Sequence, residues 1–157
     1  MKMEPDVAVR RVVPEDLEWM FQLQLDPDSN RMASTIPRVR EDFFIHWGQV
    51  CQDPSVVAKV VLVGGEKVGC VVAFPRDGQT HVAYWISPDR WGQGIATAAL
   101  RLLLVEIDCR PLHATVAVTN RASLRVLAKC GFQRQGSRQV AASDRHPAGT
   151  DELLVLP

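Results

Sequence analysis

Residues 84–97 read Tyr-Trp-Ile-Ser-Pro-Asp-Arg-Trp-Gly-Gln-Gly-Ile-Ala-Thr, and this stretch decides the fold. An apolar run ends in a turn with glycines at positions 92 and 94, and a long apolar segment follows directly. Glycine adopts positive φ without steric penalty and leaves no side chain between the backbone amides and a ligand. The first amides of a helix lack intrahelical partners and lie at the positive end of its dipole. The stretch therefore predicts a strand, a phosphate-binding turn and a helix.

The segments around this turn predict a mixed sheet with helices packed on it. β-branched and apolar runs predict strands at residues 7–13, 56–63, 68–74, 80–86, 112–118 and 152–156, with one more after Phe132. Helical spacing of apolar residues predicts helices from about 14 to 25, 40 to 51, 94 to 108 and 121 to 130. Residues 26–30 break the helical pattern, and residues 31–38 and 140–150 are interpreted as loops. This order predicts an α+β fold in a single domain over residues 1–157.

The predicted helix at 94–108 and the chain length both indicate how much of the protein is buried in a core. The helix is apolar around most of its circumference, so we expect it to be buried on more than one side. A chain of 157 residues suffices for one domain that buries about two-thirds of its unfolded surface. No second domain is needed.

Composition excludes several classes of partner. Lysine plus arginine equals aspartate plus glutamate, 18 each, so no overall field attracts nucleic acid or a membrane surface. The start of the chain lacks the apolar core of a signal peptide, and no apolar run reaches membrane length. A cytoplasmic location is therefore expected. The four cysteines form no C-x-x-C pair, which argues against a zinc ribbon or a redox dithiol and predicts buried thiols without a metal.

Two other glycine-rich motifs do not fit the turn. A dinucleotide-binding G-x-G-x-x-G needs a third glycine, but Thr97 occupies that place. A Walker loop needs Gly-Lys followed by Ser or Thr, and the turn lacks this sequence. The turn is thus not a Rossmann or P-loop site.

Three motifs together resemble a known family. Trp91-Gly92-Gln93-Gly94-Ile95-Ala96 is followed by Asn120-Arg121-Ala122-Ser123 and then by Lys129-Cys130-Gly131-Phe132. Over nearly the whole chain they resemble the GNAT superfamily of acetyl-CoA-dependent N-acetyltransferases. The chain is most similar to the RimJ/RimL-like branch, which acetylates N-termini of ribosomal proteins. The resemblance implies the GNAT fold, a central, mostly antiparallel twisted sheet of about seven strands flanked by about four helices.

The resemblance also implies a cofactor, a reaction and a set of contacts. The reaction is direct transfer of an acetyl group from acetyl-CoA to a primary amine, without an acyl-enzyme, and homodimers are common in the family. The implied cofactor contacts are Ile86, Ser87, Trp91, Gly92, Gln93, Gly94, Ile95, Ala96, Thr97 and Asn120. Trp91 stands where the superfamily usually has arginine or glutamine. Asn120 has two compatible interpretations, a hydrogen bond to the pantetheine arm and a helix N-cap.

An acceptor amine with a pKa near 8 is mostly protonated at neutral pH, so transfer needs a base. His81 is the first candidate, because it lies on the strand leading to the turn and imidazole titrates in the useful range. Members of the resembled branch often carry a glutamate at this place. His81 as a plain polar residue on a half-exposed strand, and Glu41, Asp42 or His46 as the base, stay open as alternatives.

The departing thiolate needs a proton. The superfamily often uses a tyrosine four residues before the glycine of the Gly-Phe step, but that position is Leu127 here. Ser123 matches a serine that can do this work in the ribosomal branch, and its alternative is a capping or packing role. A backbone amide in residues 84–86 would polarise the carbonyl, while Cys130 is interpreted as a core residue.

The acceptor is the least determined part of the prediction. Residues 26–46 and 137–150 would line its cleft, and Arg31, Arg38 and Arg40 either select an acidic acceptor or form a solvated face. A protein N-terminus and a small-molecule amine or amino acid fit equally. A second hypothesis is a non-catalytic acyl-CoA-binding or regulatory module, because Leu127 and His81 replace common catalytic side chains.

Overall fold

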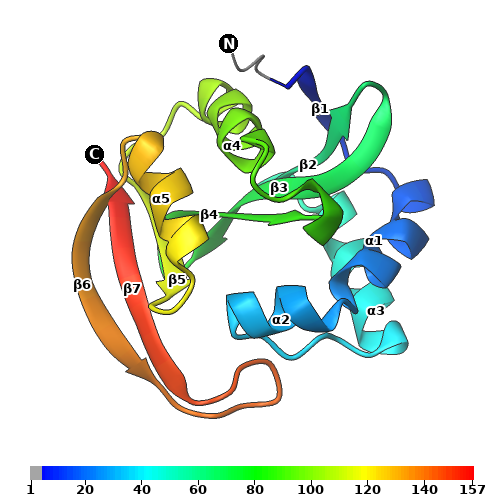
Figure 1. Cartoon of the computed structure of the whole chain (residues 1–157). Helices are drawn as coiled ribbons and strands as arrows, with labels where there is room; N and C mark the ends of the chain where they lie inside the picture. Colours follow the sequence, from blue (N-terminus) through cyan, green and yellow to red (C-terminus); the bar gives the residue numbers. More distant parts are fainter. Residues whose placement is uncertain (1–4) are drawn as a thin grey trace.

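The computed structural model describes residues 5–157, so most of the chain start on which the signal-peptide prediction rests lies outside the described residues. Seven strands form one sheet in the order β1-β2-β3-β4-β5-β7-β6 (Figure 1). Their bounds are β1 Val7–Arg11, β2 Val57–Val63, β3 Glu66–Arg76, β4 Gln79–Ile86, β5 Leu112–Ala117, β6 Gln133–Val140 and β7 Gly149–Leu156. Every neighbouring pair is antiparallel except β4 with β5. The predicted seven-stranded, mostly antiparallel sheet is confirmed.

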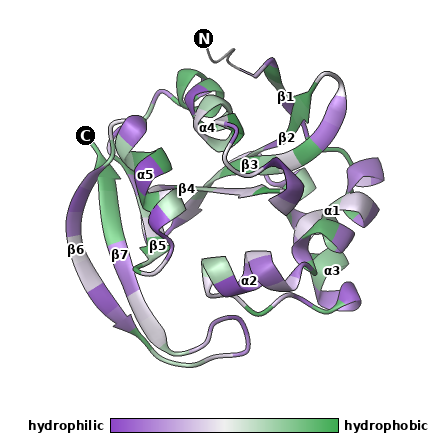
Figure 2. Cartoon of the chain, in the orientation of Figure 1, coloured by the Kyte–Doolittle hydropathy of each residue, from purple (hydrophilic) through white to green (hydrophobic). Residues whose placement is uncertain are grey.

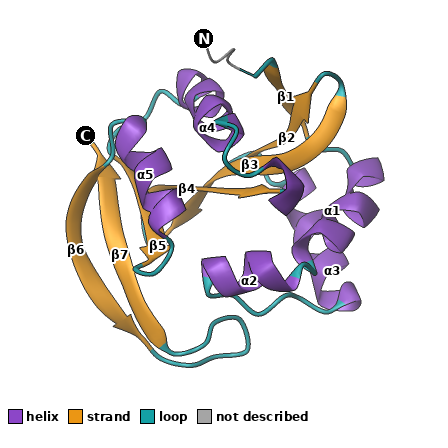
Figure 3. Cartoon of the chain, viewed as in Figure 1, coloured by secondary structure: helices purple, strands orange, loops and turns teal. Residues whose placement is uncertain are grey.

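Helices cover both faces of this sheet (Figure 3). The α-helices are α1 Leu17–Gln24, α2 Pro27–Ala33, α3 Arg40–Gln52, α4 Ile95–Glu106 and α5 Arg121–Lys129. Two short 3-10 helices, η1 (Pro14–Asp16) and η2 (Pro88–Arg90), precede α1 and the glycine turn. Within residues 5–157, no helix has the length and apolarity to cross a membrane.

The helix α2 corrects the sequence prediction of a break in the helical pattern at residues 26–30. Asp26 is its N-cap, and the carboxylate Oδ2 accepts a hydrogen bond from the Ser29 amide at 2.8 Å. Pro27 occupies the first helical position, where its fixed φ suits a helix start. An Asp-Pro pair is thus a helix-start signal here rather than a break.

Two apolar clusters hold the helices to the sheet. The larger lies between α4, α5 and one sheet face and includes Val71, Ala73, Val82, Ala114, Val116, Ile95, Leu100, Leu103 and Leu127. The smaller joins α1 and α3 to the other face through Val12, Leu17, Met20, Phe21, Phe43 and Val60. Figure 2 shows green apolar segments on β3 and a largely hydrophilic β6 at the edge of the sheet. A polar edge strand protects the sheet from pairing with another chain.

The prediction that α4 is buried on more than one side is confirmed. The helix contacts β1, β3, β4 and α5, so it is buried on more than one side as expected. However, Val105 near its C-terminal end is 81% exposed and Leu102 is 38% exposed. The apolar residues that cover the outer surface of α4 therefore face solvent, because the sheet and α5 cover only part of its circumference.

The strands β4 and β5 pair over a short distance and then separate. Their register includes only Thr80 with Leu112 and His81 with His113. On its other side, β4 pairs with β3 along its full length, from Arg76 with Gln79 to Gly69 with Ile86. The β4 backbone after His81 therefore has an open edge toward β5, and the sheet contains a V-shaped opening.

Candidate active site

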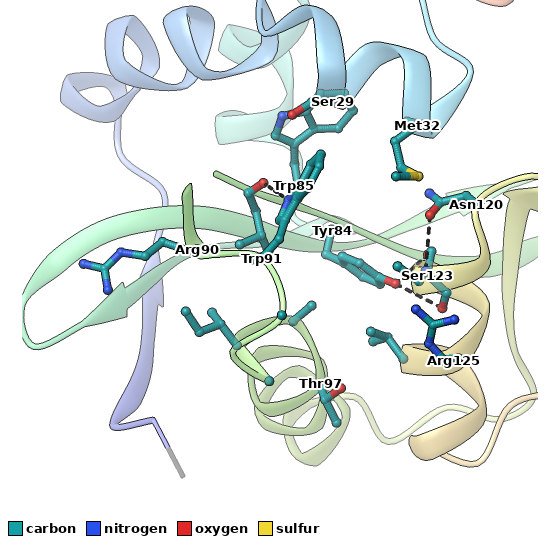
Figure 4. Close-up of a pocket in the computed structure, with 18 of the residues that line it drawn as sticks. Ser29, Met32, Tyr84, Trp85, Arg90, Trp91, Thr97, Asn120, Ser123 and Arg125 are labelled. Atoms are coloured by element: carbon teal, nitrogen blue, oxygen red, sulfur yellow. Dashed lines mark hydrogen bonds between the residues drawn. The ribbon is translucent and has the colours of Figure 1, made fainter. Parts of the chain in front are cut away.

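A cavity of about 300 Å³, here called the turn cavity, lies at the wide end of this opening (Figure 4). Its walls are the end of β4, the glycine turn, the first residues of α4, the face of α5 and part of α2. The lining includes Ser29, Met32, Tyr84, Trp85, Ile86, Trp91, Gly92, Gly94, Ile95, Ala96, Thr97, Asn120, Ser123, Arg125 and Lys129. Eight of the ten predicted cofactor contacts are in this lining.

The glycine turn has the geometry that its sequence predicts. Gly92 and Gly94 have φ of +76° and +78°, the left-handed region that favours glycine. Gly94 is the N-cap of α4 and supplies no side chain to the first amides of the helix. The amides of residues 95–97 are thus at the start of a twelve-residue helix, where the helix dipole favours an anion.

Two predicted cofactor residues, Ser87 and Gln93, lie outside the cavity lining. The Ser87 amide donates to the Val68 carbonyl at 2.8 Å, and its hydroxyl donates to the Asp89 carboxylate at 2.5 Å. The Gln93 side chain points back to the Asp89 carbonyl at 3.5 Å. Both side chains form hydrogen bonds to Asp89, and the contact of these two residues with the cofactor stays a prediction from the sequence.

Trp91 opens the turn and fixes its position against β4. Its indole Nε1 donates to the Ile86 carbonyl at 2.9 Å, and its ring is 40% exposed at the cavity wall (Figure 4). The side chain that replaces the usual arginine or glutamine therefore holds the strand end to the turn. The indole also lines the turn cavity, but it carries no charge that could bind a phosphate.

Asn120, Ser123 and Tyr84 form one hydrogen-bonded group between α5 and β4 (Figure 4). The Asn120 Oδ1 accepts from the Ser123 amide at 3.2 Å, which establishes Asn120 as the N-cap of α5. The Tyr84 hydroxyl lies 2.5 Å from the Ser123 Oγ and 3.3 Å from the Ser123 carbonyl. Burial raises the pKa of Tyr84 to about 12, so the phenol keeps its proton at neutral pH.

A second cavity of about 320 Å³, here called the sheet cavity, continues from the narrow part of the V. Phe74, His81 and His113 are register partners across β3, β4 and β5, so their side chains share the sheet face opposite the α4 and α5 cluster. Phe74 and His81 line the sheet cavity together with Arg76, Thr115, Arg138 and His146. The two cavities share Ala33, Tyr84, Trp85, Asn120 and Ser123 in their linings.

His81 is 7% exposed in the wall of the sheet cavity. Its ring stacks on Phe74 with 5.9 Å between centroids, and its Nδ1 lies 3.4 Å from an Arg76 guanidinium nitrogen. A guanidinium only donates hydrogen bonds, so this contact places the Nδ1 lone pair toward Arg76 and the proton on Nε2. Burial, followed by the positive charge of Arg76, lowers the pKa of His81 to about 4. The imidazole is therefore neutral at pH 7 and a weak base.

The alternative bases lie elsewhere. Glu41, Asp42 and His46 on α3 are absent from the linings of both cavities. Burial, with the nearby Arg38, lowers the pKa of His46. Burial likewise raises the pKa of the Cys130 thiol, in agreement with its interpretation as a packing residue.

The arginines predicted to read an acidic acceptor are largely occupied. Arg31 pairs with Asp28 at 2.9 Å, and Arg40 pairs with Glu18 at 2.6 Å. Neither of them lines a cavity, nor does Arg38. The guanidinium groups that do line the sheet cavity belong to Arg76 on β3 and Arg138 on β6, which sequence reasoning did not single out.

The sequence prediction also missed the Tyr84 hydroxyl. It assigned a role only to the backbone amides of residues 84–86 and none to their side chains. The sequence indicated this position through the alternation of Val82, Tyr84 and Ile86. Alternate residues of a strand share one face, so all three side chains lie on the face of β4 that α4 and α5 cover. A phenol on that face lies beside whichever helix follows β5. Its partner could therefore be sought near Ser123.

This fold and this arrangement of turn, opening and cavities define an acetyltransferase. The model of the acetyltransferase (GNAT) domain matches residues 6–133, and the chain belongs to that family. The predicted enzyme class and GNAT fold are thereby confirmed, and the family assignment favours an enzyme over a non-catalytic binding module.

Individual relatives are distant in sequence. The YdaF protein of Bacillus subtilis (strain 168), whose name provisionally describes a ribosomal N-acetyltransferase, is 24% identical over 151 residues, which cover 86% of this chain and 82% of YdaF. Mycobacterium smegmatis RimJ in complex with a CoA disulfide has a TM-score of 0.72 at 24% identity, covering 95% of this chain and 80% of RimJ. A spermidine N-acetyltransferase chimera of Vibrio cholerae SpeG and hSSAT has a TM-score of 0.78 at 15% identity, covering 96% of this chain and 94% of the chimera. The name of YdaF agrees with the resemblance to the ribosomal branch, and the RimJ and chimera structures show the same fold.

Proposed function

We propose that this acetyltransferase moves the acetyl group of acetyl-CoA to a primary amine at the V-shaped opening between β4 and β5. The observation that carries the proposal is the junction of two cavities around Tyr84, Trp85, Asn120 and Ser123. A donor in the turn cavity and an acceptor in the sheet cavity would meet there with their reacting atoms side by side. Holding two reactants in such proximity is a large part of catalysis.

The residues of the turn cavity fit acetyl-CoA. The glycine turn and the first amides of α4 would bind the pyrophosphate, while Lys129 and Arg125 in the lining add positive charge. Ser29 and Trp85 line this cavity, and their buried atoms Ser29 Oγ and Trp85 Nε1 have no hydrogen-bond partner among residues 5–157. Buried polar atoms are rarely left without partners, and the amide groups of a pantetheine arm could supply them.

The open edge of β4 suits the same arm. The backbone after His81 has no partner on β5, so its amides and carbonyls can pair with an extended ligand as a strand would. An amide in residues 84–86 is also placed to donate to a carbonyl oxygen at the junction. We therefore retain Ile86, Trp91, Gly92, Gly94, Ile95, Ala96, Thr97 and Asn120 as proposed cofactor contacts.

Acetyl-CoA, when bound, supplies the acetyl group as a thioester whose cleavage leaves a thiolate that needs a proton. The Ser123 hydroxyl is the proposed donor of that proton. The Tyr84 hydroxyl, 2.5 Å from Ser123 Oγ, would support it by donating to that oxygen. A hydroxyl that accepts a hydrogen bond becomes a better donor itself. The pair compensates for Leu127, which stands where the family often has its acid.

His81 keeps its proposed place in the acceptor site with a changed role. Its pKa of about 4 and the Arg76 contact at its Nδ1 make it a poor partner for an ammonium group. We propose that the acceptor enters as the neutral amine, so that its nitrogen lone pair is free to attack the thioester. The Nε2 proton of His81 would hold another polar group of the acceptor, and the proton that the amine loses on acetylation would leave through water. A cytoplasmic location and a homodimer remain predictions from the sequence.

The first experiment is the thermal midpoint of the protein with and without acetyl-CoA. Ligand at about 100 times its dissociation constant should raise the free energy of unfolding by about 2.7 kcal/mol. Release of free thiol on addition of a panel of amines then measures turnover. A chain that gains no stability from saturating acetyl-CoA, and releases no thiol with any amine, would overturn the proposal.

A further inference from the structure

We infer that the acceptor of this enzyme is an amine that carries an anionic group, a carboxylate or a phosphate, bound in the sheet cavity by Arg76 and Arg138. This inference rests on the proposed function, because it names the acceptor of the same reaction. The observation that carries it is the charge of the cavity wall. Two guanidinium groups line the sheet cavity, and Asp151 is its one acidic lining residue.

Arg76 is held in the cavity without a carboxylate partner. It ends β3, and its guanidinium lies 3.3 Å from the Thr115 Oγ1 on β5, so the side chain reaches across β4. On the way it passes the His81 ring and lies 6.0 Å from the centre of the Phe74 ring. Within residues 5–157 no carboxylate lies within ion-pair distance of Arg76. Its neighbour Asp77 is not among the residues that line the sheet cavity, although its negative charge acts on His81.

Arg138 approaches the cavity from the other end of the sheet. It lies on β6 beside Asp151 of β7, and the closest approach of their charged groups is 3.9 Å. That distance exceeds the range of a charge-assisted hydrogen bond, so the guanidinium keeps donors available. The Arg138 side chain is 51% exposed, which allows it to move toward a ligand.

Neutral donors between the two arginines complete an anion site. The Nε2 proton of His81 and the hydroxyl of Thr115 belong to the same sheet face and the same lining. Carboxylates and phosphates accept several hydrogen bonds at once, and arginine binds both with two parallel bonds. Since carboxylate and phosphate share this chemistry, the experiment has to separate them.

The same charges disfavour polycationic acceptors. A polyamine would place further ammonium groups beside two guanidinium groups, and like charges in a partly buried site repel strongly. For a single amine the field has a useful effect, because it lowers the pKa of the ammonium and favours the neutral nucleophile. An anionic group on the acceptor offsets the repulsion and anchors the molecule with its amine toward the junction.

Matched acceptors test this charge preference directly. β-Alanine is compared with β-alaninamide, O-phosphoethanolamine is compared with ethanolamine, and spermidine serves as the polycation. Thiol release gives kcat/KM for each, corrected for the fraction of neutral amine. We expect at least one anionic member to exceed its neutral partner by about tenfold or more, as for one lost charged contact, and spermidine to be the poorest. The pair with the larger ratio identifies carboxylate or phosphate.

Variants assign the preference to the two arginines. Arg76→Gln and Arg138→Gln should each reduce the ratio of kcat/KM for the anionic amine to kcat/KM for its neutral partner by about fivefold or more. Arg11→Gln, at an exposed position of the edge strand β1, is the matched control and should keep the ratio. Equal ratios in all three variants and in the parent would overturn the inference.

Calorimetry on the protein saturated with CoA separates this inference from the proposed function. It measures acceptor binding without turnover, with the same pairs of amines. Tighter binding of an anionic amine, lost in Arg76→Gln, supports the inference even if every rate is low. Acetylation of neutral amines and spermidine at rates equal to the anionic ones would leave the acetyltransferase proposal intact and refute the anion site.

Discussion

The Tyr84 hydroxyl lies 2.5 Å from the Ser123 Oγ, and this contact joins β4 to α5 where the turn cavity and the sheet cavity meet. Only one of the two hydroxyl protons is used between the pair. With Tyr84 as the donor, the Ser123 proton is left to point into the junction. In the proposed mechanism, β4 would supply the phenol that the family often takes from the helix. Leu127, at the position of that tyrosine, packs in the core and is 1% exposed.

The first prediction concerns this pair. Ser123→Ala and Tyr84→Phe should each lower kcat by about tenfold or more, because proton donation to the leaving group is impaired. Acetyl-CoA affinity should change little, since neither hydroxyl is proposed to hold the cofactor. Steady-state kinetics and calorimetry measure the two quantities separately, and Ser137→Ala at an exposed position of β6 is the control.

A loss of affinity with unchanged kcat in Tyr84→Phe would assign the pair to cofactor binding instead. The double variant adds a second criterion. If the two hydroxyls act as one unit, the double variant should be about as slow as either single variant. Fully multiplicative losses would show independent roles.

The second prediction concerns the turn. Gly94→Ala should lower the free energy of unfolding by about 1 kcal/mol, because alanine is strained at the observed φ of +78°. A Cβ at this position meets no atom within 4 Å, so the loss is a backbone effect and not a clash. Acetyl-CoA affinity should fall as well, since the amides shift. Chemical denaturation and calorimetry measure both.

Gly136→Ala is the matched control, because a Cβ there also meets open space and its φ lies outside the strained range. Gly136→Ala should leave the free energy of unfolding unchanged or raise it slightly, and it should leave the acetyl-CoA affinity unchanged. An equal loss of acetyl-CoA affinity in both variants would remove the turn from the proposed cofactor site.

The sequence predicts the parts of this site that depend on local conformation. Glycines at 92 and 94 require a particular backbone, and Asn120 is a strong N-cap, so both could be placed without a structure. The helix α2 was missed although Asp26 and Pro27 carry its start signal. Seven residues leave little room for an apolar period to appear.

The parts that depend on strand order could not be predicted in this way. Arg76 and Thr115 are 39 residues apart and meet because β3, β4 and β5 are neighbours in the sheet. Arg138 enters the cavity because β7 lies between β5 and β6. His81 looked like a base because imidazole usually titrates near neutral pH, but its burial beside Arg76 lowers the pKa to about 4. Only the tertiary environment supplies that information.

The third prediction concerns Asp16, which is 2% exposed at the junction of β1, η1 and β3. Its carboxylate accepts from Arg10 at 2.8 and 2.9 Å, from Lys67 at 3.2 Å and from the Val13 amide at 2.9 Å. The Arg10 hydrogen bonds in particular hold its pKa well below the usual range. Asp16→Asn should lower the free energy of unfolding by about 2 kcal/mol, because the buried side chain loses its charge-assisted hydrogen bonds to Arg10 and Lys67.

Asp28→Asn is the control for Asp16. Asp28 pairs with Arg31 at 2.9 Å, but both side chains are exposed, at 64% and 76%. Removal of such a surface pair should cost less than about 1 kcal/mol. Equal and small losses in the two variants, measured by urea denaturation at pH 7, would mean that the Asp16 network does not hold β1 to β3.

The fourth prediction concerns the pH dependence of stability and follows from His81. Its pKa falls from an ordinary value near 6.5 in the unfolded chain to about 4 in the folded one. Between these values the unfolded state binds more protons, so folding is disfavoured progressively as the pH falls. The loss begins near pH 6.5, is about 3 kcal/mol by pH 4, and is absent above pH 7.

His81→Gln should flatten this part of the stability profile, because glutamine does not titrate. The free energy of unfolding is measured by urea denaturation at several pH values from 7.5 to 4.5. His146→Gln, at an exposed position, should leave the slope as in the parent. The pH dependence of kcat/KM gives an independent check. As the pH increases, kcat/KM should rise around the pKa of the acceptor amine and show no step near pH 6.5. A step at that pH that stays fixed for acceptors of different pKa, and disappears in His81→Gln, would restore His81 as the general base.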